Sequence, residues 1–204
     1  MGFYSRAVLP LLCDFGLDRP FVARYRRELL THANGDILEI GFGTGLNLPL
    51  YPPHVRKVTT VDPNVGMYRK SRRRIKEVGI EIDQRVGLSE RLPFDDRSFD
   101  CVVSTFTLCS IKDVAQALAE VYRVLKSGGE LLFLEHGLSP ELNVQKWQHR
   151  LNWLQMRLAD GCHLDRDVRA LVTAQPYASV TIDEFYLEKT PKTHGYTYRG
   201  RATK

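Results

Sequence analysis

The feature that most restricts the fold of this chain is a short apolar strand that runs directly into three closely spaced glycines. The segment reads Asp36-Ile-Leu-Glu-Ile-Gly-Phe-Gly-Thr-Gly45. Glycine is needed where the backbone takes a positive φ or comes within contact distance of a ligand. In an open parallel sheet, such a turn lies beyond the carboxyl end of a strand, where ligands bind. The segment therefore predicts a ligand-binding α/β domain.

Apolar strands alternate with helical segments after this turn, which is the order that gives a parallel sheet. The expected strands are residues 36–40, 57–61, 80–86, 99–104, 130–135, 180–187 and 196–202. The expected helices are residues 20–30, 47–51 in part, 64–78, 113–125, 141–158 and 166–173. Asp113 is the expected cap of its helix, and Gly128 with Gly129 the expected stop.

Charge and cysteine content narrow the class of protein. The net charge of +5 is a mild bias and does not indicate nucleic acid as a partner. The arginine clusters at residues 24–27 and 69–74 are interpreted as solvated helix faces; the alternative is a surface that meets anionic lipid or an acidic substrate. In the helix 20–30, Phe21, Tyr25 and Leu29 share one face, and the arginines are expected largely to face away.

The four cysteines, Cys13, Cys101, Cys109 and Cys162, are scattered and form no CxxC pair. A zinc site or disulfide framework is therefore not expected, and we predict no metal. Four free thiols suit a reducing compartment. The longest apolar run near the start, residues 7–12, is too short to span a membrane and does not resemble a signal peptide. We therefore expect a cytoplasmic protein.

Two residues decide which nucleoside cofactor suits the turn. The glycine spacing is GxGxG, and Leu46 occupies the position of the third glycine in a dinucleotide fingerprint. Glu39 lies two residues before Gly41, where a carboxylate opposes a pyrophosphate but favours a ligand with an ammonium and a sulfonium group. S-adenosylmethionine (SAM) carries both. An NAD(P)-dependent oxidoreductase and a non-catalytic SAM-binding protein remain alternatives.

Two further segments are candidates for the nucleoside site. Asp62 ends the second strand about 20 residues beyond the turn, where ribose hydroxyls are held; its structural alternative is a helix N-cap. The loop from Gly87 to Asp100 follows the third strand, so by position it flanks the adenine, and taken alone it reads as an ordinary polar loop.

Together these three segments resemble the class I SAM-dependent methyltransferases over roughly residues 35–136. Within them, LPFDDRSFD and EVYRVLKSGGELLFLEH look like the branch that includes the ubiquinone/menaquinone C-methyltransferases. A narrower likeness to the thiol S-methyltransferases of animals rests on Tyr51-Pro-Pro, residues 105–110, Glu135-His136, Trp147 and the run Asp160-Gly-Cys-His-Leu-Asp-Arg166. Bacterial phospholipid N-methyltransferases share the same outline.

The resemblance implies a Rossmann-like sheet of seven strands, six parallel and one antiparallel, flanked by helices and preceded by an N-terminal helical extension. It implies one domain over residues 1–204, with a helical cap (1–34), a cofactor-binding half (35–136) and a substrate-binding half (137–204). It also implies a small-molecule methyl acceptor. The sequence does not define the oligomeric state.

Carried over residue by residue, the resemblance assigns the cofactor contacts. Glu39, Gly41, Gly43 and Gly45 would surround the methionine part of SAM, and Asp62 would bind both ribose hydroxyls. Thr105 would lie beside the methionine moiety, and the adenine pocket would be formed by Leu88, Ser89 and Glu90. Many relatives have Asp in place of Leu88, so here a backbone carbonyl or the side chain of Ser89 or Glu90 must bind the adenine amino group.

His136 is the first candidate for acceptor chemistry, because it follows the fifth strand and so faces the pocket edge. An imidazole there can take a proton or hold a polar substrate near neutral pH; the alternative is a structural histidine bonded to Glu135 or a loop carbonyl. Asp165 is expected to cap a helix beside Cys162 and His163. Trp147 and Trp153 are expected in the core or the pocket wall. Cys109, near the end of the fourth strand, is expected to fill space, with contact to the substrate as the alternative.

The first predicted acceptor is an apolar or amphiphilic thiol, with a quinone or phospholipid as alternatives. The basic helix 20–30 also leaves peripheral membrane contact open.

Overall fold

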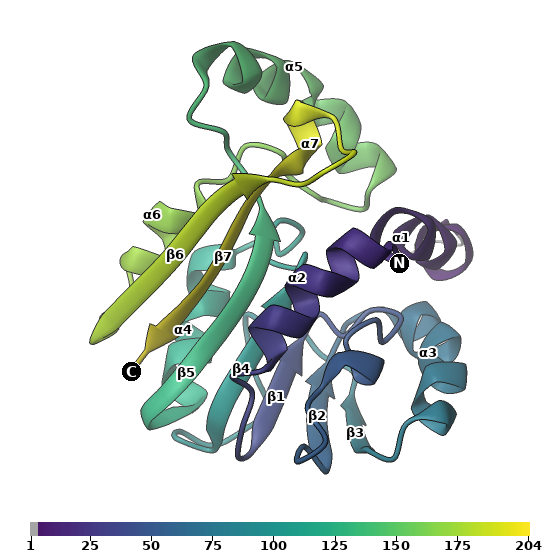
Figure 1. The fold of residues 1–204 in the computed structure, drawn as a ribbon, viewed down its shortest axis with the longest axis vertical. Coiled ribbons are helices and arrows are strands. Elements are labelled where there is room, and N and C mark those ends of the chain that lie inside the picture. The colour runs from purple at the N-terminus through teal and green to yellow at the C-terminus, as the bar shows by residue number, and fades with distance from the viewer. Residues whose placement is uncertain (1–3) are drawn as a thin grey trace.

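Seven strands form one sheet in the computed structural model, which describes residues 4–204 (Figure 1). The order across the sheet is β3-β2-β1-β4-β5-β7-β6. The bounds are β1 (Ile37–Ile40), β2 (Lys57–Val61), β3 (Glu81–Arg85), β4 (Phe99–Thr105), β5 (Leu125–His136), β6 (Ser179–Tyr186) and β7 (Tyr196–Thr203). Strands β1 to β5 pair in parallel, and β7 is antiparallel to both β5 and β6. The prediction of six parallel strands and one antiparallel strand is therefore confirmed.

Helices cover both faces of this sheet. Their bounds are a π-turn (Tyr4–Val8), α1 (Leu9–Leu17), α2 (Pro20–Leu30), a 3-10 turn (Leu48–Leu50), α3 (Val65–Glu77), α4 (Val114–Val124), α5 (Leu142–Leu158), α6 (Val168–Thr173) and α7 (Lys192–Gly195). Helix α2 crosses one face, while α4 and α6 lie against the other (Figure 1).

Strand β5 shows how a central strand serves both faces. Successive side chains of a strand point to opposite sides, so its apolar residues divide between two cores. Leu131 and Phe133 pack in the cluster that contains α4 and α6, whereas Leu132 and Leu134 pack in the cluster that contains the end of α2. A continuous apolar run of this kind is typical of a strand buried on both faces.

The connection between α4 and β5 differs from the prediction. Asp113 caps α4 as expected, because its carboxylate accepts from the Gln116 N–H at 3.0 Å. The helix ends at Val124, however, and not at the glycine pair. Strand β5 begins at once and contains an irregularity in its pairing with β4, in which Gly128 adopts a φ of +77°. The glycine therefore permits a bulge inside the strand and does not stop the helix.

Gly200 offers a test of the packing between β7 and β5. A Cβ at this position would collide with the Phe133 ring and the backbone oxygen of Thr181. We expect Gly200→Ala to lower the free energy of unfolding by about 1–3 kcal/mol, the usual cost of overpacking, measured by urea denaturation. Gly79→Ala is the matched control, because a Cβ there meets nothing within 4 Å. Equal midpoints for both variants would contradict this account of the packing.

Candidate active site

The three glycines of the first turn all have backbone conformations that other residues rarely adopt. The φ values are +64° for Gly41, +57° for Gly43 and +80° for Gly45. The Gly41 N–H donates to the Val61 carbonyl at 2.8 Å, so the turn is fixed to the end of β2. The positive φ expected from the sequence is confirmed, and it holds the turn open beyond the carboxyl end of β1.

Glu39 lies at the end of β1 in an almost fully buried position, with 2% of its surface exposed. One carboxylate oxygen accepts from Asn47 Nδ2 at 2.9 Å and the other from the Tyr51 hydroxyl at 2.7 Å. Burial raises the pKa of Glu39 to about 7, and these two hydrogen bonds partly oppose that rise. The carboxyl group therefore stands ready to ionise fully when a cation approaches.

Arg26 of α2 is a buried cation that is linked to Glu39 through Asn47. Its Nη1 donates to Asn47 Oδ1 at 2.7 Å and to Thr105 Oγ1 at 2.5 Å, so Asn47 joins the two charges. Burial lowers the pKa of Arg26 to about 10, which leaves the guanidinium charged at neutral pH. Within the described residues its Nε, which is buried, has no hydrogen-bond partner.

The expectation that the arginines of α2 face away from the protein is wrong for Arg26, which is 4% exposed. The buried residues of α2 are Val22, Arg26, Leu29 and Leu30, which recur at helical spacing. The signal was thus present in the sequence, because Arg26 lies one helical turn after Val22 and just before Leu29. The neighbouring stripe of Phe21 and Tyr25 is only half-buried.

A cavity of about 630 Å³ lies at the carboxyl edge of the sheet. It brings together nearly all of the residues that the sequence predicted as cofactor contacts: Glu39, Gly41, Gly43, Asp62, Leu88, Ser89, Glu90 and Thr105. Gly45 does not line the cavity. A Cβ there would press against Leu48, Phe42 and Ser71, so this glycine permits close packing behind the turn.

Asp62 is fixed by the backbone on both of its carboxylate oxygens. Oδ2 accepts from the Gly43 N–H at 2.8 Å and Oδ1 from the Asn64 N–H at 2.7 Å. Burial raises the pKa of Asp62. The cap of α3 is Asn64, whose side chain accepts from the Gly66 N–H. The alternative role of Asp62 as the helix cap is therefore wrong, and its carboxylate lies against the glycine turn.

The loop after β3 presents side chains of different character to the cavity. Ser89 is buried, with 4% of its surface exposed, whereas Leu88 is 56% exposed. Glu90 also lines the cavity, and its Oε1 accepts from the Asp113 N–H at 3.4 Å.

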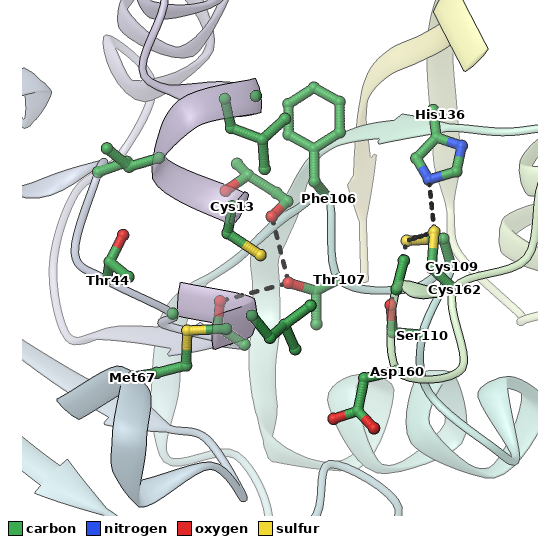
Figure 2. A pocket seen from close by; sticks show the side chains of 18 of the residues that line it. Cys13, Thr44, Met67, Phe106, Thr107, Cys109, Ser110, His136, Asp160 and Cys162 are labelled. Atoms are coloured by element: carbon green, nitrogen blue, oxygen red, sulfur yellow. Dashed lines mark hydrogen bonds between the residues drawn. The ribbon is translucent and has the colours of Figure 1, made fainter. Parts of the chain in front are cut away.

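His136 ends β5 at the opposite end of the site from the glycine turn. Its Nε2 lies 3.1 Å from Cys162 Sγ, and Cys162 Sγ lies 3.5 Å from Cys109 Sγ (Figure 2). Among the described residues His136 forms no hydrogen bond to Glu135, so this one form of the structural alternative is wrong. Glu135 instead accepts from the Ser104 hydroxyl and the Thr107 N–H.

Phe106 separates this cluster from the charged end of the site. It has a φ of +52°, an unusual value for a bulky residue and one that is enriched at functional sites. Its ring stacks on the His136 ring, with centroids 6.4 Å apart, and the Arg26 guanidinium lies over it at 5.2 Å. Phe106 therefore contacts His136 of the cysteine–histidine cluster and Arg26 of the charged pair.

Two expectations for the segment after β5 are wrong. Asp167, and not Asp165, caps α6 by accepting from the Ala170 N–H, while Asp165 contacts His149 at 3.0 Å. Trp147 and Trp153 of α5 are 55% and 61% exposed, so they form neither core nor pocket wall. The expected burial failed because both residues lie on the outer side of α5, which has only Val144 and Gln148 buried.

Across residues 4–204, the structure contains no helix with the length and apolar character required to traverse a bilayer.

Comparison with known proteins identifies the family. Residues 38–133 match the methyltransferase domain family. A thiol S-methyltransferase of Rattus norvegicus is 36% identical over 151 residues, which is 72% of this chain but only 62% of that protein. A phosphatidylethanolamine N-methyltransferase of Cereibacter sphaeroides is 31% identical over 83% of this chain and 81% of its own length.

The fold agrees with solved structures along nearly the whole chain. A SAM-dependent methyltransferase of Thermotoga maritima, described as a possible histamine N-methyltransferase, superposes with a TM-score of 0.71 at 22% identity and covers 98% of both chains. Taken with the family match and the two relatives above, the chain belongs to the SAM-dependent methyltransferases. The oxidoreductase alternative, which the glycine turn by itself left open, is thereby set aside.

The raised pKa of Glu39 makes stability depend on pH. Because the pKa in the folded protein, about 7, lies above the ordinary 4.5, the unfolded chain ionises first as pH rises. The stability contributed by neutral Glu39 is therefore fully present below pH 4.5 and is lost as pH rises through 7. We expect Glu39→Gln to remove roughly 3 kcal/mol of pH dependence between these limits, measured by urea unfolding of ligand-free protein.

The matched control is Glu77→Gln, which removes an exposed carboxylate paired with Arg73 on α3. Its pH profile should follow that of the wild type. A Glu39→Gln profile that also follows the wild type would show that Glu39 titrates normally.

Proposed function

We propose that this protein transfers a methyl group from SAM to a small-molecule acceptor, and that the acceptor is a thiol. The observation that carries the proposal is the buried pair of opposite charges at the end of β1 and in α2, which opens onto the cavity. Glu39 matches the ammonium group and the free Nε of Arg26 matches the carboxylate of an amino acid. The methionine part of SAM carries both groups, so the residues present fit this cofactor.

The other cofactor contacts follow from the cavity lining. Gly41, Gly43 and Gly45 would let the backbone approach the methionine part, with Thr105 beside it. Asp62 would bind the ribose hydroxyls, because its carboxylate is already oriented by two backbone N–H groups. Leu88, Ser89 and Glu90 would surround the adenine.

When bound, SAM supplies a methyl group that its sulfonium charge has already activated. The protein therefore has mainly to place the acceptor atom in line with that methyl group and to exclude water. An ordinary thiol with a pKa near 8.5 needs only modest help to become a thiolate. A phenol or an amine needs more help from the site to lose its proton. His136 lines the same cavity and would be the residue that holds or accepts a proton beside the acceptor.

Each of three parts of the chain would contribute a different wall of the site. Residues 35–136 would form the cofactor half, residues 1–34 the cap and residues 137–204 the acceptor half. This division is supported by the cavity wall, to which α1 and α2 contribute Leu9, Cys13 and Arg26, and the last part contributes Leu158, Cys162 and His194. A reducing, cytoplasmic location would suit the unpaired cysteines.

Peripheral membrane contact is supported at a different place from the one the sequence indicated. Helix α2 turns its Arg26 inward and pairs Arg24 with Glu188. Helices α1 and α5 instead expose large apolar side chains, of which Leu12 and Leu158 also line the cavity and Phe15 is 74% exposed. Arginines lie over three of these rings, at Phe15, Trp147 and Trp153. Aromatic residues beside cations suit an anionic lipid surface, from which an amphiphilic acceptor can enter.

The membrane proposal predicts that the variant with Phe15, Trp147 and Trp153 all changed to Ser loses vesicle binding. We expect at least about tenfold weaker co-sedimentation with phosphatidylglycerol-containing vesicles, because each transferred apolar side chain contributes on the order of 1–2 kcal/mol. Val86→Ser, at an exposed apolar residue on neither helix, is the control. No vesicle binding by the wild type at low salt would contradict the proposal.

The cofactor assignment predicts a selective loss of affinity. Glu39→Gln and Arg26→Lys should each weaken S-adenosylhomocysteine binding by about 10–100-fold, the usual effect of losing a charged hydrogen bond. Affinity for 5′-methylthioadenosine, which lacks the amino-acid part, should change little. Isothermal titration calorimetry measures both. Equal losses for the two ligands would mean that these residues support the fold and not the methionine end.

The acceptor is tested by incubating the protein with SAM and a panel of thiols, quinols and aminolipids, and measuring S-adenosylhomocysteine. We expect turnover with an apolar thiol. Turnover of a quinol or lipid but of no thiol would replace the thiol with that acceptor class. Binding of SAM with no turnover of any acceptor would contradict the enzyme assignment itself.

A further inference from the structure

Three side chains with soft or borderline donor atoms meet in the acceptor side of the cavity. Cys109 lies in the loop after β4, His136 ends β5, and Cys162 lies in the loop after α5 (Figure 2). The two sulfur atoms and one imidazole nitrogen lie within 4.8 Å of one another. All three residues line the cavity.

The spacing of these atoms is close to that of ligands around a tetrahedral zinc ion. Zinc–sulfur bonds of about 2.3 Å and zinc–nitrogen bonds of about 2.0–2.1 Å place tetrahedral ligand atoms roughly 3.5–3.8 Å apart. The observed separations are 3.5 Å between Cys162 Sγ and Cys109 Sγ and 3.1 Å between Cys162 Sγ and His136 Nε2. The third pair, Cys109 Sγ and His136 Nε2, lies within 4.8 Å, so the three atoms reach tetrahedral separations if the side chains adjust by at most about 1.3 Å.

We propose that Cys109, His136 and Cys162 bind one zinc ion, with the fourth coordination position open to the cavity. Two thiolates and an imidazole are ligands that zinc favours, and three protein ligands with one free position are typical of catalytic zinc sites. Two thiolates also neutralise the charge of the ion, which a buried site requires. The absence of a CxxC pair does not oppose the site, since each ligand comes from a different segment.

The surrounding contacts hold the two cysteine loops together without a metal. Arg166 donates to the carbonyls of Leu108 and Ile111, on either side of Cys109. The His163 N–H, next to Cys162, donates to the Cys109 carbonyl at 2.9 Å. The loop that carries Cys162 is therefore fixed to the loop that carries Cys109, so the ligands are pre-positioned.

The fourth coordination position would let the metal bind the acceptor thiol. This part of the inference rests on the proposed function. A thiol R–SH entering the cavity would transfer its proton to a zinc-bound hydroxide, which leaves as water, and its sulfur would take the vacated position as a thiolate. No oxidant or reductant is needed. The resulting centre carries one net negative charge, from three thiolates and one Zn²⁺, and this charge complements a sulfonium. The substrate class is thereby a thiol small enough to reach the cluster.

The test begins with untagged protein purified without chelators. We expect inductively coupled plasma mass spectrometry to detect about one zinc per chain, because the described residues contain one such cluster of three ligands. After replacement by Co²⁺, thiolate-to-cobalt charge transfer and the visible bands of a tetrahedral ion should appear. Adding hexanethiol should shift these bands, because the thiolate enters the open position.

Single substitutions at the cluster decide whether these residues are the ligands. Cys109→Ser, Cys162→Ser and His136→Gln should each weaken zinc binding by more than the roughly 100-fold that loss of a supporting residue costs. Cys13→Ser is the matched control, because Cys13 lines the same cavity outside the cluster. Binding of S-adenosylhomocysteine by each variant shows that it is folded.

Three results would overturn the inference: wild-type protein that neither contains nor takes up zinc in reducing buffer, cluster variants that bind zinc like the wild type, or cobalt bands that do not respond to the thiol. Cobalt bands that do not respond to the thiol would show that no coordination position is open to it. Failure of the proposed function is distinct, since a zinc-loaded protein that methylates no thiol retains the site. Conversely, unchanged thiol methylation after zinc removal would overturn the metal's role and leave the proposed function standing.

Discussion

The site depends on two opposite charges buried at the carboxyl edge of the sheet. Arg26 and Glu39 are both almost fully removed from water, and Asn47 hydrogen bonds to each of them. Burying charges is costly unless hydrogen bonds and an opposite charge compensate. Tyr51 and Thr105 supply further hydrogen bonds. Four separate segments therefore have to converge before either charge is tolerated, and this convergence shapes the cavity.

The same arrangement explains why the N-terminal helices are part of the site. Helix α2 contributes Leu29 and Leu30 to the core on one face of the sheet and extends Arg26 over the strand ends. The buried Nε of that arginine has no hydrogen-bond acceptor among the described residues. A ligand with a carboxylate relieves this cost, so the energy of burying Arg26 in the free protein favours binding of an amino-acid group.

Local sequence signals were enough to predict the fold and most of the residues that line the cavity beside the glycine turn. Positive φ at Gly41, Gly43 and Gly45 is a local requirement, and the strand ends that carry Glu39, Asp62 and Thr105 are set by apolar runs. Because parallel strands end at one edge, these residues had to meet there. The bulge at Gly128 escaped prediction because a glycine pair stops a helix or bends a strand equally well.

The part of the cavity around His136 was less predictable because it depends on contacts between distant segments. Cys109 and Cys162 lie 53 positions apart, and their meeting depends on how the loop after α5 folds back over β4. Trp147 and Trp153 belong to a helix whose buried face is narrow, so their apolar character did not determine their burial. In each case the residue types were visible, but the partner surface was set only by tertiary packing.

The most direct measurement is a crystal structure of the protein with S-adenosylhomocysteine. The account predicts that the ligand's carboxylate accepts from Arg26 Nε at about 2.7–3.2 Å, with its ammonium group beside the Glu39 carboxylate and its nucleoside between Asp62 and residues 88–90. A ligand whose amino-acid group lies away from both charges would contradict the central claim, even if the nucleoside occupied the same cavity.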